Sequence, residues 1–337
     1  MTVGLNINDL VLVTPDDFRR HKCSTTSHIH TKNCFGYSCH IAQYDLTLNI
    51  RYFLVQEHVL GCRIELASTL DYPLQLTCYL THLHTHNPST SRLWEHGWYT
   101  LCDRAEGYTM LGKASEGNVF LHGARAATGT PLSWGEAGVC ETLEQVAAWA
   151  SGARVPMPNI TQHQPETGWQ VRAVALPCSL TVGARTTEPV VLNALLVRGV
   201  SQDQARGYWN TGLAHMARAQ AAHLQADEHF WHTAPQLSGD WPASWRRGLV
   251  YDLETLRMTM RPPLGVLPEV LDGMQIQAPR TVLAEAAMDV LFLSYADPAL
   301  AAAVILGHFE SAPHPNLPCM REDGSYNMVA DDGQICG

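Results

Sequence analysis

The sequence predicts a β + α protein of more than one domain, with a β-rich first part and a helical second part. Apolar residues alternate with polar ones in short runs up to about Val200, and they recur at helical spacing from about Gln204 onward. The chain has 337 residues, which leaves room for two domains. We expect a first domain over residues 1–203, a linker over 204–240 and a second domain over 241–337.

Composition and charge narrow the class of protein. Hydrophobic residues make up 46% of the chain and charged residues 16%, which favours a large folded core over disorder. The formal net charge is −10 and no lysine and arginine block is present, so nucleic acid is not an expected partner. No apolar run is long enough to cross a bilayer, and the first residues do not resemble a signal peptide. No membrane contact and a cytoplasmic location are therefore predicted.

The first 200 residues have the pattern of an antiparallel β-sandwich. In Tyr44–Leu54 every second residue from Leu46 to Ile50 is apolar, as in a half-buried strand. Glu141–Ala150 is predicted to be a short helix in a loop. Turns rich in glycine and proline separate further strand candidates. These candidates are Cys62–Leu66, Leu74–Leu80, Asn118–His122, Gly168–Ala175, Cys178–Gly183 and Val190–Val197. The cysteines within such runs, among them Cys62, Cys78 and Cys178, are expected to be buried thiols.

Four helices are predicted after Ser201. The first, Ala205 to Phe230, is polar enough to be a linker lying across a surface. The second runs from Trp245 to Met260 and ends before Pro262, with Arg246, Arg247, Glu254 and Arg257 away from its apolar side. The third covers Pro279 to Ser294, and Asp297 caps a fourth over Ala299–Phe309. The short link between the last two predicts antiparallel neighbours.

Three histidines stand at alternate positions in the run Thr81–His86. If the strand that contains Leu74–Leu80 continues, His82, His84 and His86 share one of its faces, where three imidazoles are candidate zinc ligands. The acidic ligand at cupin spacing is missing and no βα repeat follows. The favoured interpretation is a strand end whose histidines face a domain interface or solvent.

A second group of histidines and cysteines lies near the start of the chain. Its members are His21, Cys23, His28, His30, Cys34, Cys39 and His40. These residue types suit zinc, but their spacing matches no zinc-finger pattern. We therefore predict neither a metal nor another cofactor.

Asp272 is the candidate ligand-binding residue of the helical part. It follows a loop rich in proline and glycine, and Gln275 and Gln277 come directly after it. Polar groups on a loop at the mouth of a helical array are suited to bind a polar ligand. The alternative is that Asp272 only caps the helix that follows.

The order of these features resembles the six-hairpin glycosidases, whose catalytic domain is an (α/α)6 toroid. The shared order is a β-sandwich, a linker helix, a Trp-bearing helix, a Pro/Gly loop, an Asp and a helix–turn–helix containing Asp297–Ala301. The pattern is most similar to the trehalase, processing α-glucosidase and mannosylglycerate hydrolase group. The resemblance covers residues 204–337 and, more loosely, the part before them.

The resemblance implies that Asp272 binds the sugar and that the loop Glu322–Gly337 lines the active-site funnel. In the family a tryptophan precedes this aspartate, whereas Leu271 stands there in this chain. Trp245 or Trp241 is therefore the candidate surface on which the sugar stacks. Asp272, Gln275 and Trp245 form the expected substrate-binding set.

The activity implied by the resemblance is inverting hydrolysis of α-linked glucosides or related small saccharides. One carboxylic acid protonates the glycosidic oxygen while a carboxylate activates water. The resemblance implies that both lie in hairpins later than the Asp272 region, so neither is expected within this chain. The adjacent Asp331 and Asp332 are interpreted as solvated turn residues.

We expect an incomplete toroid whose partner is its missing C-terminal part or another subunit, and an isolated chain without activity. A glycoside phosphorylase and a non-catalytic carbohydrate-binding or scaffold protein are the alternatives.

Overall fold

The computed structural model describes residues 1–86, 98–113, 119–127, 129–153, 170–186, 188–261, 263, 269–272, 281–311 and 319–320. The chain divides into two compact units. The first comprises Met1–His30 and Cys34–His223, and the second comprises Thr31–Asn33 and Leu224–Gly337. The predicted domain limits at 203 and 240 stay a prediction. No helix in the described ranges is long and apolar enough to cross a membrane.

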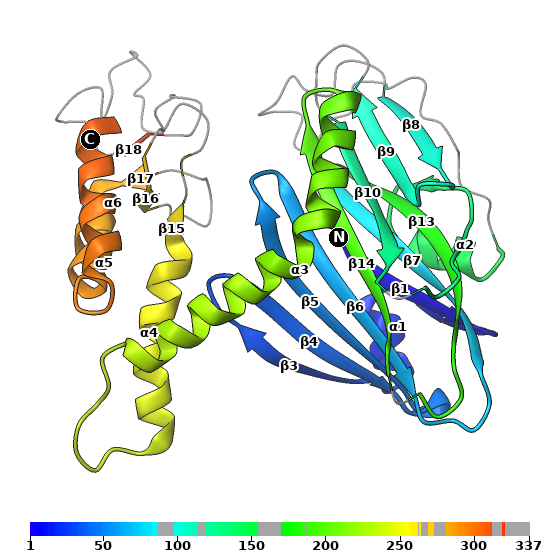
Figure 1. Cartoon of the computed structure of the whole chain (residues 1–337), viewed down its shortest axis with the longest axis horizontal. Helices are drawn as coiled ribbons and strands as arrows, with labels where there is room; N and C mark the ends of the chain where they lie inside the picture. Colours follow the sequence, from blue (N-terminus) through cyan, green and yellow to red (C-terminus); the bar gives the residue numbers. More distant parts are fainter. Residues whose placement is uncertain are drawn as a thin grey trace. The chain divides into compact units, whose positions relative to one another are not determined.

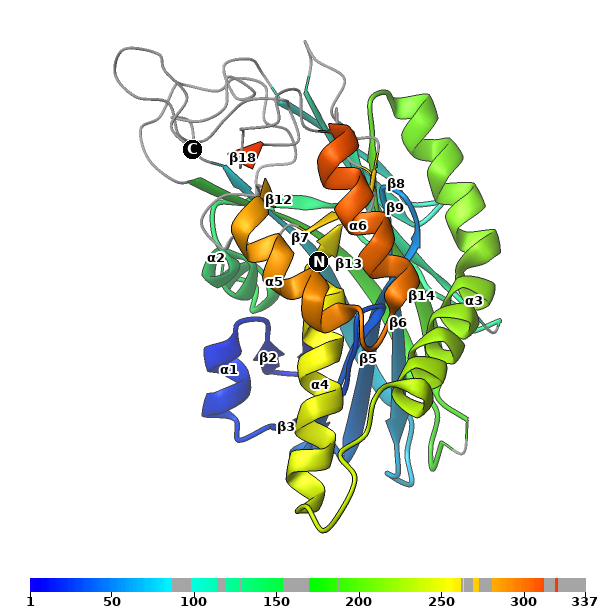
Figure 2. The same ribbon diagram turned by 90° about the vertical axis from the view of Figure 1, so that its left-hand side faces the viewer.

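The first unit is built on two antiparallel sheets (Figures 1 and 2). The six-stranded sheet has the order β11-β13-β7-β1-β2, with β12 also paired to β13, and the eight-stranded sheet has the order β3-β4-β5-β6-β14-β10-β9-β8. The six strands are β1 (Thr2–Ile7), β2 (Leu10–Leu12), β7 (Leu74–His86), β11 (Ser133–Trp134), β12 (Gly138–Cys140) and β13 (Gln170–Val182). The eight strands are β3 (Ser24–His30), β4 (Cys34–Ile41), β5 (Leu46–Gln56), β6 (Val59–Ser68), β8 (Trp98–Asp103), β9 (Tyr108–Lys113), β10 (Val119–Ala126) and β14 (Val190–Gly199).

One strand replaces the two that were predicted around Pro177, so that prediction was wrong. β13 runs through Pro177, whose carbonyl accepts a hydrogen bond from the Gly135 amide at 3.0 Å. In an antiparallel strand the amide and carbonyl of one residue point to the same side. The missing N–H of Pro177 therefore faces the gap between β11 and β12, where no ladder hydrogen bond is lost.

Both sheets contribute to one hydrophobic core. Its members include Leu5, Leu76, Cys78 and Leu80 from the first sheet and Leu48, Ile50, Cys62, Ile64 and Leu192 from the second. Cys62, Cys78 and Cys178 form no disulfide, and burial raises the pKa of the Cys62 thiol to about 12. The prediction of buried thiols in the strands is confirmed for Cys62, Cys78 and Cys178, each of which is 0% exposed.

The first unit also contains short helical segments. Helix α1 (Pro15–Arg20) begins with a capping box between Thr14 and Asp17, and α2 (Leu143–Ala150) begins at the N-cap residue Thr142. A 3-10 turn, η1, covers Ala42–Tyr44. The predicted short helix over 141–150 is thus confirmed, whereas β1 to β4, α1, β8 and β9 were not foreseen.

Helix α3 (Gln202–Thr233) begins in the first unit, where it lies directly on the eight-stranded sheet. Trp209 and Met216 are each only 1% exposed. Gly212 makes the close approach possible, since a Cβ atom there would stand 2.9 Å from Leu195 and 3.0 Å from Val59. This helix therefore has a buried side, which its polar composition did not indicate.

The second unit continues with three helices and two short β-pairs. These are α4 (Ala243–Thr259), α5 (Leu283–Leu293), α6 (Pro298–Ser311), β15 (Met260–Arg261) with β16 (Leu271–Asp272), and β17 (Thr281–Val282) with β18 (Cys319–Met320). The Asp297 carboxylate accepts the Leu300 amide at 3.0 Å, which confirms the predicted N-cap of α6. The neighbouring α5 and α6 share a core, but α5 begins at Leu283, later than predicted.

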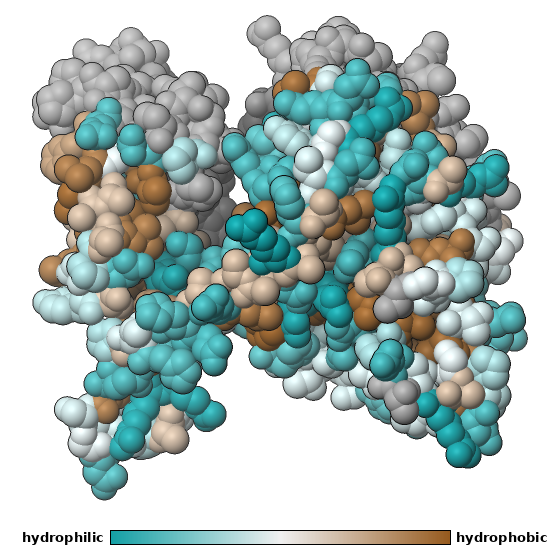
Figure 3. All heavy atoms as spheres, viewed as in Figure 1, coloured by the Kyte–Doolittle hydropathy of each residue, from teal (hydrophilic) through white to brown (hydrophobic). Residues whose placement is uncertain are grey.

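One side of α5 and α6 is apolar and exposed. The inner side holds Val290, Leu293, Ala301 and Val304, all at most 5% exposed. The outer side carries side chains that are between 42% and 72% exposed, and Figure 3 shows brown surface over these helices. They are Met288, Leu291, Phe292, Ile305, Leu306 and Phe309. We call these six residues the outer apolar face.

Replacing Leu306 and Phe309 together by glutamine should reduce the fluorescence of the apolar dye 8-anilinonaphthalene-1-sulfonate bound to the chain. Both side chains are already exposed, so the unfolding free energy should change by about 0.5 kcal/mol or less. Thr255→Gln, at an exposed position on α4, is the matched control and should leave the dye signal unchanged. Equal dye fluorescence in the double variant and the wild type contradicts an open apolar face.

Candidate functional site

Two stacked tryptophans mark the start of α4. The rings of Trp241 and Trp245 lie 5.5 Å apart with an interplanar angle of 20°, and the residues are 43% and 61% exposed. Pro242 stands between them at the N-cap, where its carbonyl accepts the Trp245 amide at 3.0 Å. The result is an exposed aromatic platform on an ordered helix start.

The turn before this platform is held by the backbone of Gly239. This residue has a φ of +97°, a conformation that favours glycine. Its carbonyl accepts a hydrogen bond from the Arg246 guanidinium at 2.8 Å. Arg246, which the sequence placed on the polar side of the helix, thus ties the turn to the first turn of α4.

Asp272 lies in the short strand β16, which pairs with β15. The residue is 2% exposed, and its amide donates to Nε2 of His308 at 3.4 Å. Burial lowers the pKa of His308, which favours the neutral imidazole that can accept this hydrogen bond. Helix α5 begins only at Leu283, so Asp272 is not the N-cap residue of that helix.

The structure does not bring Trp245 and Asp272 together. Met260, the β-bridge partner of Asp272, stands fifteen positions after Trp245 at the other end of α4. At about 1.5 Å per helical residue, the two positions are roughly 22 Å apart. They cannot contact the same sugar ring. Gln275, Gln277, Asp331, Asp332 and the loop 322–337 lie outside the described residues.

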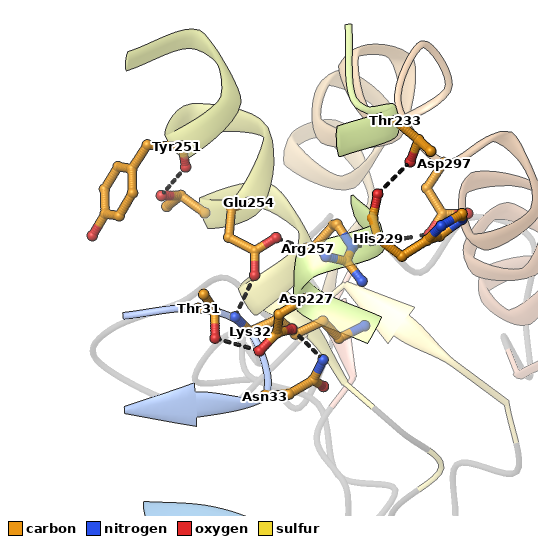
Figure 4. A network of polar contacts seen from close by, with 11 residues as sticks. Thr31, Lys32, Asn33, Asp227, His229, Thr233, Tyr251, Glu254, Arg257 and Asp297 are labelled. Carbon is orange, nitrogen blue, oxygen red and sulfur yellow. Dashed lines mark hydrogen bonds and ion pairs between the residues drawn. The ribbon is translucent and has the colours of Figure 1, made fainter. Parts of the chain in front are cut away.

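A buried polar network holds the residues Thr31–Asn33 in the second unit (Figure 4). Asp227 accepts hydrogen bonds from the Thr31 hydroxyl and the Asn33 amide, each at 2.5 Å. Glu254 accepts the Lys32 backbone amide, also at 2.5 Å.

Arg257 connects this network to the helices. Its guanidinium donates to Glu254 at 2.7 Å, lies 3.9 Å from the Asp297 carboxylate and stacks over the Phe230 ring at 3.9 Å. Burial lowers the pKa of Lys32, and the nearby Arg257 lowers it further. The network serves to satisfy buried charges, because donors already occupy the oxygens of Asp227 and Glu254.

The prediction that Glu254 and Arg257 lie on a polar side of α4 was wrong. Glu254 is fully buried and Arg257 is 8% exposed. Their spacing of three positions on α4 is the one local signal that they form a pair. Their partners Thr31–Asn33 come more than 190 residues earlier and could not be found from helical periodicity.

Strand β7 continues through His86, as one of the sequence hypotheses required. His82 is 5% exposed, and its ring lies 5.6 Å from the His84 ring and 5.9 Å from the ring of His122 on β10. Nε2 of the fully buried His122 donates to the Leu80 carbonyl at 3.2 Å and so joins the two sheets. The side chain of His86 lies outside the described residues.

The metal hypotheses gain no support from these positions. Among the described residues, no group of three or more histidine, cysteine, aspartate or glutamate side chains is arranged to hold a metal ion. In the second candidate group, Cys34 and Cys39 are buried in the core, whereas His21, His28 and His30 are exposed. These candidate cysteine ligands therefore lie in the interior, and these candidate histidine ligands lie at the surface.

Comparison with known proteins gives a likeness of fold. No protein-family model matches the chain, and no curated protein matches it. Its structure is similar to that of a human-microbiome protein described as a kojibiose phosphorylase, with a TM-score of 0.56 and 10% identity over 96% of this chain and 42% of that one. The chain thus spans less than half the length of that protein.

A bacterial glucoamylase solved with acarbose is a weaker likeness. Its TM-score is 0.46 at 9% identity, over 76% of this chain and 35% of that one. At 10% identity the likeness to the phosphorylase concerns the fold alone. The β + α fold of this chain is therefore similar to part of the fold of a carbohydrate-active enzyme.

The buried histidines predict a loss of stability in mild acid. Burial lowers the pKa of His122 to about 4 and holds that of His82 well below its usual range. Between pH 6.5 and 4 the unfolded chain takes up protons that the folded chain excludes. The unfolding free energy should therefore fall by about 3 kcal/mol for His122 alone.

Chemical denaturation at a series of pH values measures this effect. His122→Gln retains a hydrogen-bond donor but cannot titrate, so its unfolding free energy should depend less on pH. His215→Gln, at an exposed position on α3, should give the wild-type curve. An unaltered pH dependence in His122→Gln contradicts the prediction.

Arg257→Met should lower the unfolding free energy by about 3–5 kcal/mol, because it leaves the buried Glu254 carboxylate without its cation. Thermal or denaturant unfolding measures the change. Glu228→Gln, which removes an exposed carboxylate on α3, should cost about 0.5 kcal/mol or less. Equal losses in both variants contradict a special role for the buried pair.

Proposed function

We propose that this chain supplies a carbohydrate-binding part of a glycoside hydrolase that acts on α-linked glucosides or related small saccharides. The exposed pair Trp241 and Trp245 is the observation that carries the proposal. The fold likeness to a kojibiose phosphorylase over 96% of the chain supports the same class of substrate.

The chemistry of the tryptophan pair suits a sugar ring. A pyranose presents C–H groups on one side, and the face of an indole ring attracts such groups because its π-system is electron-rich. Large aromatic side chains left open to water are typical of binding surfaces. Because the platform is fixed at the helix start by Pro242 and Gly239, little conformational entropy is lost when a sugar binds.

Asp272 has a separate role in this proposal. The resemblance to six-hairpin glycosidases assigns it to sugar binding, together with Gln275. With 2% exposure, the carboxylate would meet a sugar only after the residues around it had moved. The tryptophan pair is therefore the site at which we expect the first contact with saccharide.

The proposed hydrolase is completed by further helices. We propose that an (α/α)6 toroid contains α4 to α6 and that its remaining helices, in the same or another subunit, cover the outer apolar face and supply an inverting acid and base. The apolar side chains on that face are suited to helix packing. Bond cleavage is then a property of the assembled toroid.

A glycoside phosphorylase is the second candidate function. The name of the protein that shares the fold favours it. The two activities differ in the acceptor, which is water in a hydrolase and inorganic phosphate in a phosphorylase. Fold alone does not separate them, so the test has to vary phosphate.

Calorimetric titration of the 337-residue chain with maltose and kojibiose tests the binding proposal. Trp245→Ala should weaken binding about tenfold, which corresponds to about 1.4 kcal/mol. Tyr251→Ala, which removes an exposed aromatic residue farther along α4, should bind like the wild type. Wild-type affinity in Trp245→Ala, or an equal loss in Tyr251→Ala, contradicts the proposed platform.

The same saccharides, incubated with the chain in the presence and absence of phosphate, test catalysis. We expect no released monosaccharide and no sugar phosphate. A phosphate-dependent product would favour a phosphorylase over a hydrolase. Any cleavage by the chain alone, with or without phosphate, would contradict the assignment of cleavage to an assembled toroid.

A further inference from the structure

The outer face of the six-stranded sheet carries a groove that the proposed function does not use. Its volume is about 490 Å³, within the range of small-molecule sites. Strands β1, β7 and β13 form its floor, and the segment Thr130–Ser133 forms one side. The groove lies wholly within the first unit.

The groove is lined by neutral polar groups. Eight of its twelve lining residues carry an amide or a hydroxyl group, and none carries a charge. The eight are Asn6, Asn8, Gln75, Thr77, Thr130, Ser133, Ser179 and Thr181, and the other four are Leu76, Pro131, Leu132 and Leu180. Amides and hydroxyls both donate and accept hydrogen bonds, which is also the property of each hydroxyl group on a sugar.

Strand register aligns these groups in rows. Asn6 on β1 is the Cα partner of Thr77 on β7, and Thr77 is the partner of Ser179 on β13. The three side chains therefore stand side by side across the sheet, in steps of roughly 5 Å. Gln75 and Thr181 form a second row, two residues along the same strands.

Existing hydrogen bonds fix part of the first row. The Thr77 and Ser179 hydroxyls lie 2.9 Å apart, and the Asn6 amide nitrogen donates to the Ala150 carbonyl at 2.6 Å. This second bond orients Asn6 so that its side-chain oxygen remains the acceptor. The groove thus offers polar groups whose positions are set before a ligand arrives, which lowers the entropic cost of binding.

The lining selects among ligand classes. An anion or a cation would lack an opposite charge in the groove. An apolar ligand would strip water from many amides and hydroxyls at a cost of roughly 1–3 kcal/mol for each group left without a partner. A neutral polyhydroxylated molecule can replace that water with direct hydrogen bonds.

We propose that this groove is a second saccharide-binding site, in which a neutral sugar is held through its hydroxyl groups. It is separate from the tryptophan pair, which belongs to the second unit. The choice of maltose and kojibiose as probes rests on the proposed function. The proposal that the groove binds a neutral sugar is supported separately, by the residues that line it and by the strand register that aligns them.

Titration of the Trp245→Ala chain with these two sugars isolates the groove. We expect weak binding to persist in this variant and to weaken at least fivefold when Thr77→Val and Ser179→Ala are added. Thr47→Val on β5, in the other sheet, is the matched control and should leave the residual binding unchanged.

A second variant distinguishes loss of binding from loss of folding. Ser179 is exposed, so Ser179→Lys keeps the core intact while it places a long charged side chain in the groove. It should abolish the residual binding with an unchanged melting temperature. Glucuronate and glucosamine, the charged probes, should bind no more tightly than maltose.

The outcomes separate the two sites. If the residual binding survives both sets of groove variants, the proposed groove site is wrong. The proposal is also wrong if Trp245→Ala alone abolishes all saccharide binding. Binding that is lost in the groove variants but is unaffected by Trp245→Ala supports the groove and contradicts the tryptophan platform.

Discussion

The antiparallel pairing of β7 with β13 is the constraint on which most of the first unit depends. The two strands are in register over thirteen residue pairs, from Leu74 opposite Val182 to His86 opposite Gln170. Side chains alternate between the two faces of a strand, so this register decides what faces the core. A slip of one residue would expose Leu76 and Leu80 and bury Gln75 and Thr77.

The same register determines which polar side chains face the core and which face the groove. The inward positions that hold Leu76 and Leu80 continue to His82, which meets His122 from the other sheet in the core. The outward positions hold Thr77 and its neighbours in the groove. Buried imidazoles and surface hydroxyls are thus two consequences of one alternation.

Local signals explain what could be predicted from the sequence. Alternation located β5, β6 and β7, helical spacing located α4, and the Asp297-Pro298 pair located the start of α6. Strand β3 was missed because its residues are nearly all exposed and follow no alternation. Two strands were predicted in place of β13 because a proline usually ends a strand. Pro177 is tolerated within β13 because it faces the gap between β11 and β12.

The candidate site was predictable only where its residues are close in sequence. Trp241 and Trp245 are four positions apart, so their contact follows from the helix start. The separation of Trp245 from Asp272 follows from the helix that lies between them, which the resemblance alone did not reveal. Pairing among β1, β7 and β13 assembles the groove from distant segments, and no single run of sequence contains that information.

The insertion of Thr31–Asn33 into the second unit has a consequence for the order in which the protein can fold. These residues bind Asp227 and Glu254, which follow them by about 200 positions along the chain. A ribosome completes the β3–β4 hairpin long before it makes α4, so the hairpin tip has to wait for its partners. The helices that emerge later complete their polar interior with a tripeptide that was synthesised near the beginning of translation.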